Sequence, residues 1–136
     1  MNSEEILELI NIAKEARKYS YSPYSDFPIG AALLTNDGDV FTGTNVENAS
    51  YGLTNCAERT AIFKAVSEGF KKFKAIAIVA DTERPVPPCG TCRQVIQEFG
   101  NDINVIMANL KGDYQCYTIN KLLPAAFERK DMENEL

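Results

Sequence analysis

Histidine is absent from the 136 residues of this chain. Its absence removes the side chain that most often serves as a general base, and with it every Ser-His and Cys-His nucleophilic pair. The commonest nitrogen ligand for zinc is missing for the same reason. Any proton transfer in an active site must therefore fall to a carboxylate, a lysine or a tyrosine.

Signals for membranes and nucleic acids are missing too. No apolar run is long enough to span a bilayer, and the acidic start, Met1 to Glu5, is unlike a secretory signal. We therefore expect neither a membrane-spanning segment nor a secretory signal. The formal net charge is −5 without any stripe of Lys and Arg, which argues against a nucleic-acid partner. We expect a soluble cytoplasmic protein whose four cysteines are ligands or free thiols.

The order of the hydrophobic patterns indicates an α/β fold. Apolar residues spaced three and four apart predict an amphipathic helix from Ser3 to Tyr19, and Asp37-Gly38 between two β-rich runs predicts an antiparallel hairpin. Further helices are expected at 56–68, 89–99 and near Leu122, and strands at 29–35, 40–46, 75–80, 103–108 and 115–119. This order predicts a three-layer α-β-α sandwich around a mixed five-stranded sheet.

The length of the chain limits its domain organisation. A chain of 136 residues can bury a real hydrophobic core but is too short for two domains, so we expect a single domain over residues 1–136. The charged segment 128–136 is expected to be a mobile tail.

Two short cysteine segments carry the chemistry, namely Cys56-Ala57-Glu58 and Pro88-Cys89-Gly90-Thr91-Cys92. Three thiolates can hold a zinc ion and leave one coordination position open, which distinguishes a catalytic zinc from a structural one. Each segment lies where a loop enters a helix, whose N-terminus favours the thiolate. We expect parallel neighbouring strands to bring the two helix starts together at one edge of the sheet.

Glu58 stands two residues after the first cysteine. A carboxylate beside the open position can take a proton from a zinc-activated water and return it to a leaving amine. Alone, Glu58 would be read as an ordinary residue of a first helical turn. Beside Cys56 it predicts hydrolysis, and more narrowly deamination.

A closed structural zinc site completed by Cys116 is the main alternative. Cys116 lies in a strand-like segment without a turn that would aim it at the helix starts, and a closed site would leave Glu58 without a role. We therefore expect Cys116 to be a buried free thiol.

Charge compensation is a further requirement, because three thiolates and one zinc ion sum to −1. Arg59 and Arg93, each directly after a residue of the cysteine segments, are candidates to donate hydrogen bonds to the sulfurs. The alternative is that both arginines lie on solvated helix faces.

The chain resembles the small, homotetrameric cytidine deaminases over nearly its whole length. The motifs that carry the resemblance are Cys56-Ala57-Glu58-Arg59-Thr60-Ala61 and Pro88-Cys89-Gly90-Thr91-Cys92-Arg93-Gln94, preceded by Tyr21-Ser22-Pro23-Tyr24-Ser25 and Asn45-Val46-Glu47-Asn48-Ala49. Thr91 stands where alanine is common in the family. The resemblance implies a cytidine deaminase-like fold and the hydrolysis of cytidine and deoxycytidine to uridine and deoxyuridine, with release of ammonia.

The resemblance also assigns the metal site. One zinc ion per chain would be held by Cys56, Cys89 and Cys92 and would activate the attacking water. Glu58 would protonate the ring nitrogen and then the leaving group, while the backbone amide of Ala57 would bind the ring carbonyl.

By position in the family, Phe27 would stack on the pyrimidine, Asn45 and Glu47 would hold a ribose hydroxyl, and Phe127 would contribute to a neighbouring subunit's site in a homotetramer. Asn45 and Glu47 are two apart, so in an extended segment they face the same way. A polar loop that satisfies its own turn is the alternative. Phe27 alone would more often be a core residue.

The substrate class can be narrowed further. We expect Glu47 to be a buried carboxylate at the sugar that repels a phosphate, so that free nucleosides are preferred over nucleotides. Two other functions stay open: a deaminase of a nucleoside-like antibiotic such as blasticidin S, and a zinc-stabilised binding protein without activity.

Overall fold

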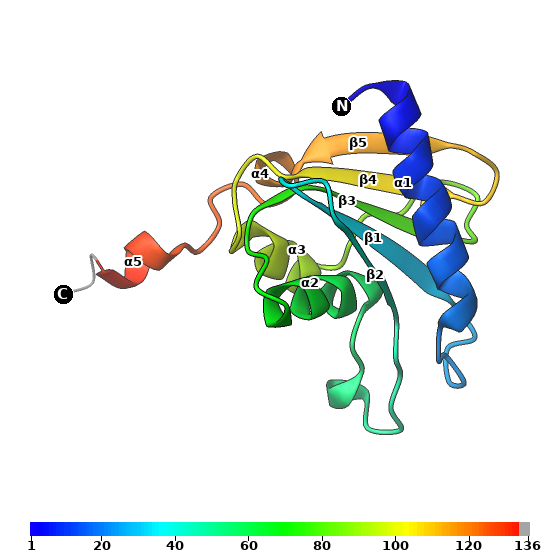
Figure 1. Cartoon of the computed structure of the whole chain (residues 1–136). Helices are drawn as coiled ribbons and strands as arrows, with labels where there is room; N and C mark the ends of the chain where they lie inside the picture. Colours follow the sequence, from blue (N-terminus) through cyan, green and yellow to red (C-terminus); the bar gives the residue numbers. More distant parts are fainter. Residues whose placement is uncertain (134–136) are drawn as a thin grey trace.

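The structure, a computed structural model, describes residues 1–133. A five-stranded sheet forms its centre, with strand order β2-β1-β3-β4-β5. The β3–β4 pair is parallel and the other three pairs are antiparallel, so the sheet is mixed as predicted. Helix α1 covers one face of this sheet, and α2 and α3 cover the other (Figure 1).

Apart from α5, the strands and helices lie within a few residues of the predicted ranges. The strands are β1 (Ile29–Thr35), β2 (Val40–Thr44), β3 (Phe73–Ala80), β4 (Asn104–Asn109) and β5 (Tyr114–Thr118). The helices are α1 (Ser3–Ala16), α2 (Ala57–Ser67), α3 (Gly90–Gln97), α4 (Ile119–Leu122) and α5 (Arg129–Glu133). The predicted three-layer α/β sandwich is therefore confirmed.

Helix α1 packs through one apolar stripe. Asn2 and Glu5 form a reciprocal capping box that satisfies the first free amides of the helix. Leu9, Ile10 and Ala13 are buried against small residues of β1, β3 and β4, including Ala32. This apolar layer fixes α1 on the sheet face that lies away from the cysteine segments.

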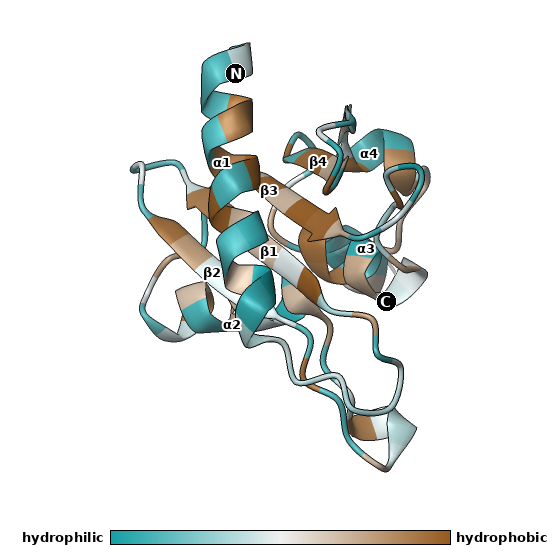
Figure 2. Cartoon of the chain, turned by 90° about the vertical axis from the view of Figure 1, so that its right-hand side faces the viewer, coloured by the Kyte–Doolittle hydropathy of each residue, from teal (hydrophilic) through white to brown (hydrophobic). Residues whose placement is uncertain are grey.

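The larger core lies under α2 and α3 on the opposite face. Ile62 of α2 and Ile96 of α3 are both buried against Ile76 and Ile78 of β3. Strand β3 is hydrophobic along most of its length, as expected for a central strand that is covered on both faces (Figure 2). These contacts hold the two helices that begin at the cysteine segments.

The two helix starts meet at one edge of the sheet, but the predicted reason was only partly right. The strands that lead into them, β2 and β3, run in the same direction because both pair antiparallel with β1. They are not neighbours, since the hairpin places β1 between them. Equal direction, rather than direct pairing, brings Cys56 and Cys89 to the same edge.

Strand β5 corrects the expectation for Cys116. It is an edge strand whose Tyr114 to Tyr117 are exposed, and Cys116 is exposed with them. Because β5 ends the sheet and pairs with β4 alone among the described strands, its side chains stay exposed, and the predicted burial of Cys116 was wrong.

The charged C-terminal segment is partly ordered into a helix. Its residues 129–133 form α5, which was not predicted, and residues 134–136 of the expected mobile tail lie outside the described residues. Among residues 1–133, no helix is long and apolar enough to cross a membrane.

Gly43 provides a stability test of the contact between β2 and α2. A Cβ at this position would lie 2.4 Å from the Ala57 carbonyl oxygen and 2.5 Å from the Ala61 nitrogen, both backbone atoms that cannot rotate away. We expect Gly43→Ala to lower the free energy of unfolding by about 1–3 kcal/mol in urea denaturation. Gly52→Ala is the control, since its Cβ would meet nothing within 4 Å; equal stability of the two variants would contradict the prediction.

Candidate active site

Three cysteine sulfurs converge where α2 and α3 begin. The Sγ atoms of Cys56, Cys89 and Cys92 all lie within 4.8 Å of one another. Cys56 and Cys89 are the N-cap residues of α2 and α3, and Cys92 lies one turn into α3. Tetrahedral zinc with Zn–S bonds of about 2.3 Å needs sulfurs roughly 4 Å apart, so the cluster fits one ion.

The three thiols differ in burial, and two of them have shifted pKa values. Cys92 is buried, Cys56 is half-buried and Cys89 is exposed. The pKa of Cys56 lies well below its ordinary value, first because Cys92 donates a hydrogen bond to its sulfur and then because of Arg59. The same hydrogen bond, together with burial, raises the pKa of Cys92. Cys56 therefore ionises before Cys92.

Arg59 lies where charge compensation was expected. Its Nη2 donates to Cys56 Sγ at 3.3 Å and to the Thr54 carbonyl oxygen at 3.5 Å. The Cys56 thiolate also raises the pKa of the guanidinium. In the part of the chain that the structure describes, the buried Arg59 Nε has no hydrogen-bond partner.

Arg93 has a different role from the one considered. Its Nε donates to the Pro88 carbonyl oxygen and its Nη1 to the Leu122 carbonyl oxygen, both at 2.8 Å. It is half-buried rather than solvated. The guanidinium thus binds backbone carbonyls of the loop before α3 and of the last residue of α4, and not the sulfurs.

Glu58 is buried, with only 4% of its surface exposed, although charged side chains rarely are. Burial raises the pKa of its carboxyl group to about 7, with a further contribution from the negative charge of Cys56. A carboxyl group with a pKa near neutrality can both take up and release a proton at physiological pH.

A cavity of about 290 Å³ opens beside the cysteines and Glu58. Its walls are mainly apolar, and it has contributions from five segments of the chain. The lining residues are Ser25, Phe27, Ile29, Asn45, Glu47, Thr54, Cys56, Glu58, Ile78, Ala80, Val86, Pro87, Pro88 and Cys89. Its size suits a small molecule with one flat ring and a few polar groups.

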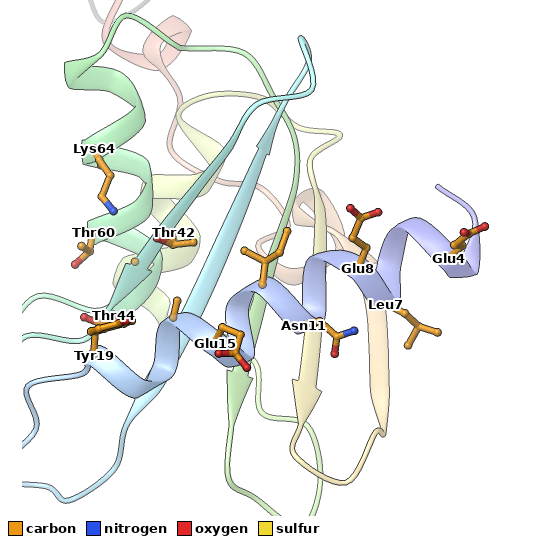
Figure 3. Close-up of a pocket in the computed structure, with 13 residues that line it drawn as sticks. Glu4, Leu7, Glu8, Asn11, Glu15, Tyr19, Thr42, Thr44, Thr60 and Lys64 are labelled. Carbon is orange, nitrogen blue, oxygen red and sulfur yellow. The ribbon is translucent and has the colours of Figure 1, made fainter.

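A larger groove of about 990 Å³ runs between α1, β2 and α2 (Figure 3). Its lining combines apolar residues such as Leu7 and Ile12 with polar ones such as Glu8, and it includes none of the three clustered cysteines. Because size alone does not provide chemistry, we assign the site to the smaller cavity with its thiols and buried carboxyl group.

Asn45 is buried and connects three segments around the cavity. Its Oδ1 accepts hydrogen bonds from the Ser20 hydroxyl at 2.5 Å and the Ile29 amide at 2.9 Å. Its Nδ2 donates to the Phe27 carbonyl oxygen at 3.0 Å. The side chain thus bonds segments that are distant in sequence, and not its own turn as the alternative interpretation held. Its amide keeps a second N–H for the cavity.

Glu47 lines the same cavity, so the two-residue spacing was informative. Its Oε1 accepts from the Tyr24 and Ser25 amides, both at 3.0 Å, and Oε2 accepts from the Ser25 hydroxyl. These hydrogen bonds, first the one from the Ser25 hydroxyl, hold the pKa of Glu47 below its usual value. The carboxylate is half-buried rather than buried as expected, and the donors that hold it belong to an exposed loop.

The two phenylalanines lie in different places. Phe27 lines the cavity with 36% of its surface exposed, whereas Phe127 is 60% exposed and does not line this chain's cavity. Ala57, the first residue of α2, is buried at the site, and its amide has no partner within the helix.

Sequence reasoning missed several residues of the site. Ser25 and Thr54 line the cavity, and Val86 and Pro87 form part of its apolar wall. Ser25 belongs to the Tyr21–Ser25 motif, which could have drawn attention to it. Thr54 and Val86 carry no local signal, since only the packing of loops brings them to the cavity.

Comparison with known protein families supports the chemistry of the site. The family model described as the "Cytidine and deoxycytidylate deaminase zinc-binding region" matches residues 3–108, which include the three clustered cysteines. A cytidine deaminase of Sporosarcina psychrophila is 57% identical over 129 residues, covering 94% of this chain and 95% of the relative.

Solved structures give the same result. The crystal structure of a cytidine deaminase from Burkholderia pseudomallei has a TM-score of 0.88 and 52% identity, and the match covers 93% of this chain and 100% of that chain.

A blasticidin-S deaminase from Bacillus cereus is more distant, at 32% identity over 135 residues, covering 93% of this chain and 95% of the relative.

Arg59 gives the first test of the metal site. We expect Arg59→Ala to bind zinc with roughly tenfold lower affinity, because loss of a group that orients a metal ligand typically costs 10–100-fold. Zinc affinity is measured by competition with a chromogenic chelator. Cys116→Ala is the cysteine control and should retain one zinc per chain. Unchanged affinity in Arg59→Ala, or loss of zinc in Cys116→Ala, would contradict this assignment.

Proposed function

Because the chain belongs to the zinc-binding cytidine and deoxycytidylate deaminase family, we propose that it hydrolyses free cytidine and deoxycytidine to uridine and deoxyuridine. The observation that carries the proposal is the buried Glu58 carboxyl group, with its pKa near 7, beside three clustered thiols in a nucleoside-sized cavity. The reaction consumes one water molecule and releases one ammonia.

Cys56, Cys89 and Cys92 would hold the zinc ion, since their sulfurs fit a tetrahedral site with one open position. When bound, zinc supplies a Lewis acid that makes water a nucleophile near neutral pH. Arg59 donates to Cys56 Sγ and thereby withdraws negative charge from the ligand set.

Glu58 would carry both proton transfers, because no histidine exists in the chain to share them. Its carboxylate takes a proton from the attacking water and delivers it to the ring nitrogen next to the reacting carbon. It then transfers the second proton of the same water to the leaving amine, which departs as ammonia. With a pKa of about 7, the carboxyl group of Glu58 can release and take up a proton near neutral pH.

The cavity would orient the nucleoside through four groups. Phe27 would stack on the pyrimidine ring, and the free amide of Ala57 would bind the ring carbonyl. The ribose would contact Glu47 and the remaining N–H of Asn45, which line one side of the cavity.

The proposal includes the oligomeric state, the domain organisation and the cellular location of the protein. Phe127 does not line this chain's own cavity and is largely exposed, which suits a side chain that completes a neighbouring subunit's site in a homotetramer. We further infer one catalytic domain over residues 1–136 and a cytoplasmic setting, supported by the four free cysteines.

Glu58→Ala tests the proton carrier. We expect purified protein to deaminate cytidine, followed as a change in ultraviolet absorbance, and the variant to lose at least about a hundredfold in kcat, as is typical for a general acid–base residue. Zinc content should be unchanged. Glu68→Ala, which alters an exposed glutamate at the end of the same helix, is the control.

The opposite outcomes separate the alternatives. A zinc-replete protein without activity on cytidine would favour a binding protein, and faster turnover of blasticidin S would favour the antibiotic deaminase.

Glu47 tests the preference for nucleosides. We expect cytidine to be preferred over cytidine monophosphate by at least about tenfold in kcat/KM, because the Glu47 carboxylate stays charged and repels a phosphate. Glu47→Gln should narrow that ratio, while Glu68→Gln should not. Comparable turnover of both substrates by the wild-type protein would show that the carboxylate does not select against phosphate.

A further inference from the structure

The chain between α4 and α5, residues 123–128, here called the C-terminal arm, presents Phe127 to solvent. The arm is far in sequence from α3 but lies against it. Gln94 Nε2, on α3, donates a hydrogen bond of 2.8 Å to the Phe127 carbonyl oxygen. The backbone of the aromatic residue is thereby held although its ring is exposed.

Two more side chains of α3 hold the arm on either side of this contact. Arg93 Nη1 donates to the carbonyl oxygen of Leu122, directly before the arm, at 2.8 Å. Gln97, which is buried, donates through Nε2 to Glu128 Oε1 at 3.0 Å. Arg93 and Gln97 lie four residues apart and so share one face of the helix.

The arm contains a sharp bend between these anchors. Ala125 has a φ of 54°, in the left-handed region that a residue with a Cβ adopts only at a cost. Such a conformation persists where the surroundings fix the chain on both sides. The anchors at Leu122 and Phe127 meet this condition.

Helix α3 also carries part of the metal site. It begins at Cys89 and includes Cys92, and Arg93 Nε donates to the Pro88 carbonyl oxygen in front of them at 2.8 Å. One short helix therefore fixes two thiols of its own subunit's site and the arm that presents Phe127.

We infer that Gln94 is a positioning residue for the reaction: it sets the place of Phe127 and, through it, the affinity of a neighbouring subunit for the nucleoside. The inference rests on the proposed function, in which Phe127 completes the neighbour's cavity. Gln94 itself does not line the cavity, so its effect reaches substrate only through the arm.

The test compares Gln94→Ala and Gln94→Glu with Gln115→Ala, an exposed glutamine on β5. Both Gln94 variants lack the N–H donor, and the second keeps the shape of the side chain. We expect each to raise KM for cytidine roughly three- to tenfold, the range for loss of one hydrogen bond, with kcat within about twofold. Gln115→Ala should match the wild type.

Three further measurements exclude a general structural effect. The zinc content, the oligomeric mass and the thermal midpoint of the Gln94 variants should stay near those of the wild type. A fall in kcat or zinc content without a rise in KM would show that Gln94 supports the metal site instead, and would overturn the inference.

A double-mutant cycle separates this inference from the proposed function. If Gln94 acts through Phe127, then Gln94→Ala should add little to the KM of Phe127→Ala. Full additivity of the two changes would overturn the inference. An unchanged KM in Phe127→Ala alone would refute the proposed role of Phe127, and absent turnover of cytidine by the wild type would refute the proposed function.

Discussion

The site depends on one geometric constraint: two helices must begin at the same edge of the sheet with their N-caps side by side. The N-caps are Cys56 and Cys89, and the constraint is met because β2 and β3 run in the same direction on either side of β1. Gly43 supports it by allowing β2 to lie directly against α2. Without this arrangement the Cys56 sulfur at the start of α2 would lie apart from the Cys89 and Cys92 sulfurs of α3.

Electrostatics then makes the cluster reactive. The hydrogen bond from Cys92, and then the Arg59 guanidinium, lower the pKa of Cys56, while burial raises the pKa of Glu58. Positive charge is thus placed at the ligands and a protonatable carboxyl group at the reacting position. In a chain without histidine, burial does for a carboxylate what the intrinsic pKa of imidazole does elsewhere.

Much of the fold was predictable, because hydrophobic periods and turn residues act locally. The hairpin, the five strands and the three main helices lie close to their predicted ranges. The errors concern residues whose surroundings are set by distant segments. Cys116 is exposed because β5 is an edge strand, and Arg93 binds the Leu122 carbonyl because α4 lies beside α3.

The sequence by itself determined the kind of chemistry: three cysteines and a glutamate at fixed spacing, no histidine, and an acidic net charge of −5. These are properties of residue types and short spacings. The tertiary structure alone decided that the sulfurs converge, that Glu58 is buried, and that α3 holds the C-terminal arm. Those features need contacts between segments tens of residues apart, which only the packed sheet and its covering helices bring together.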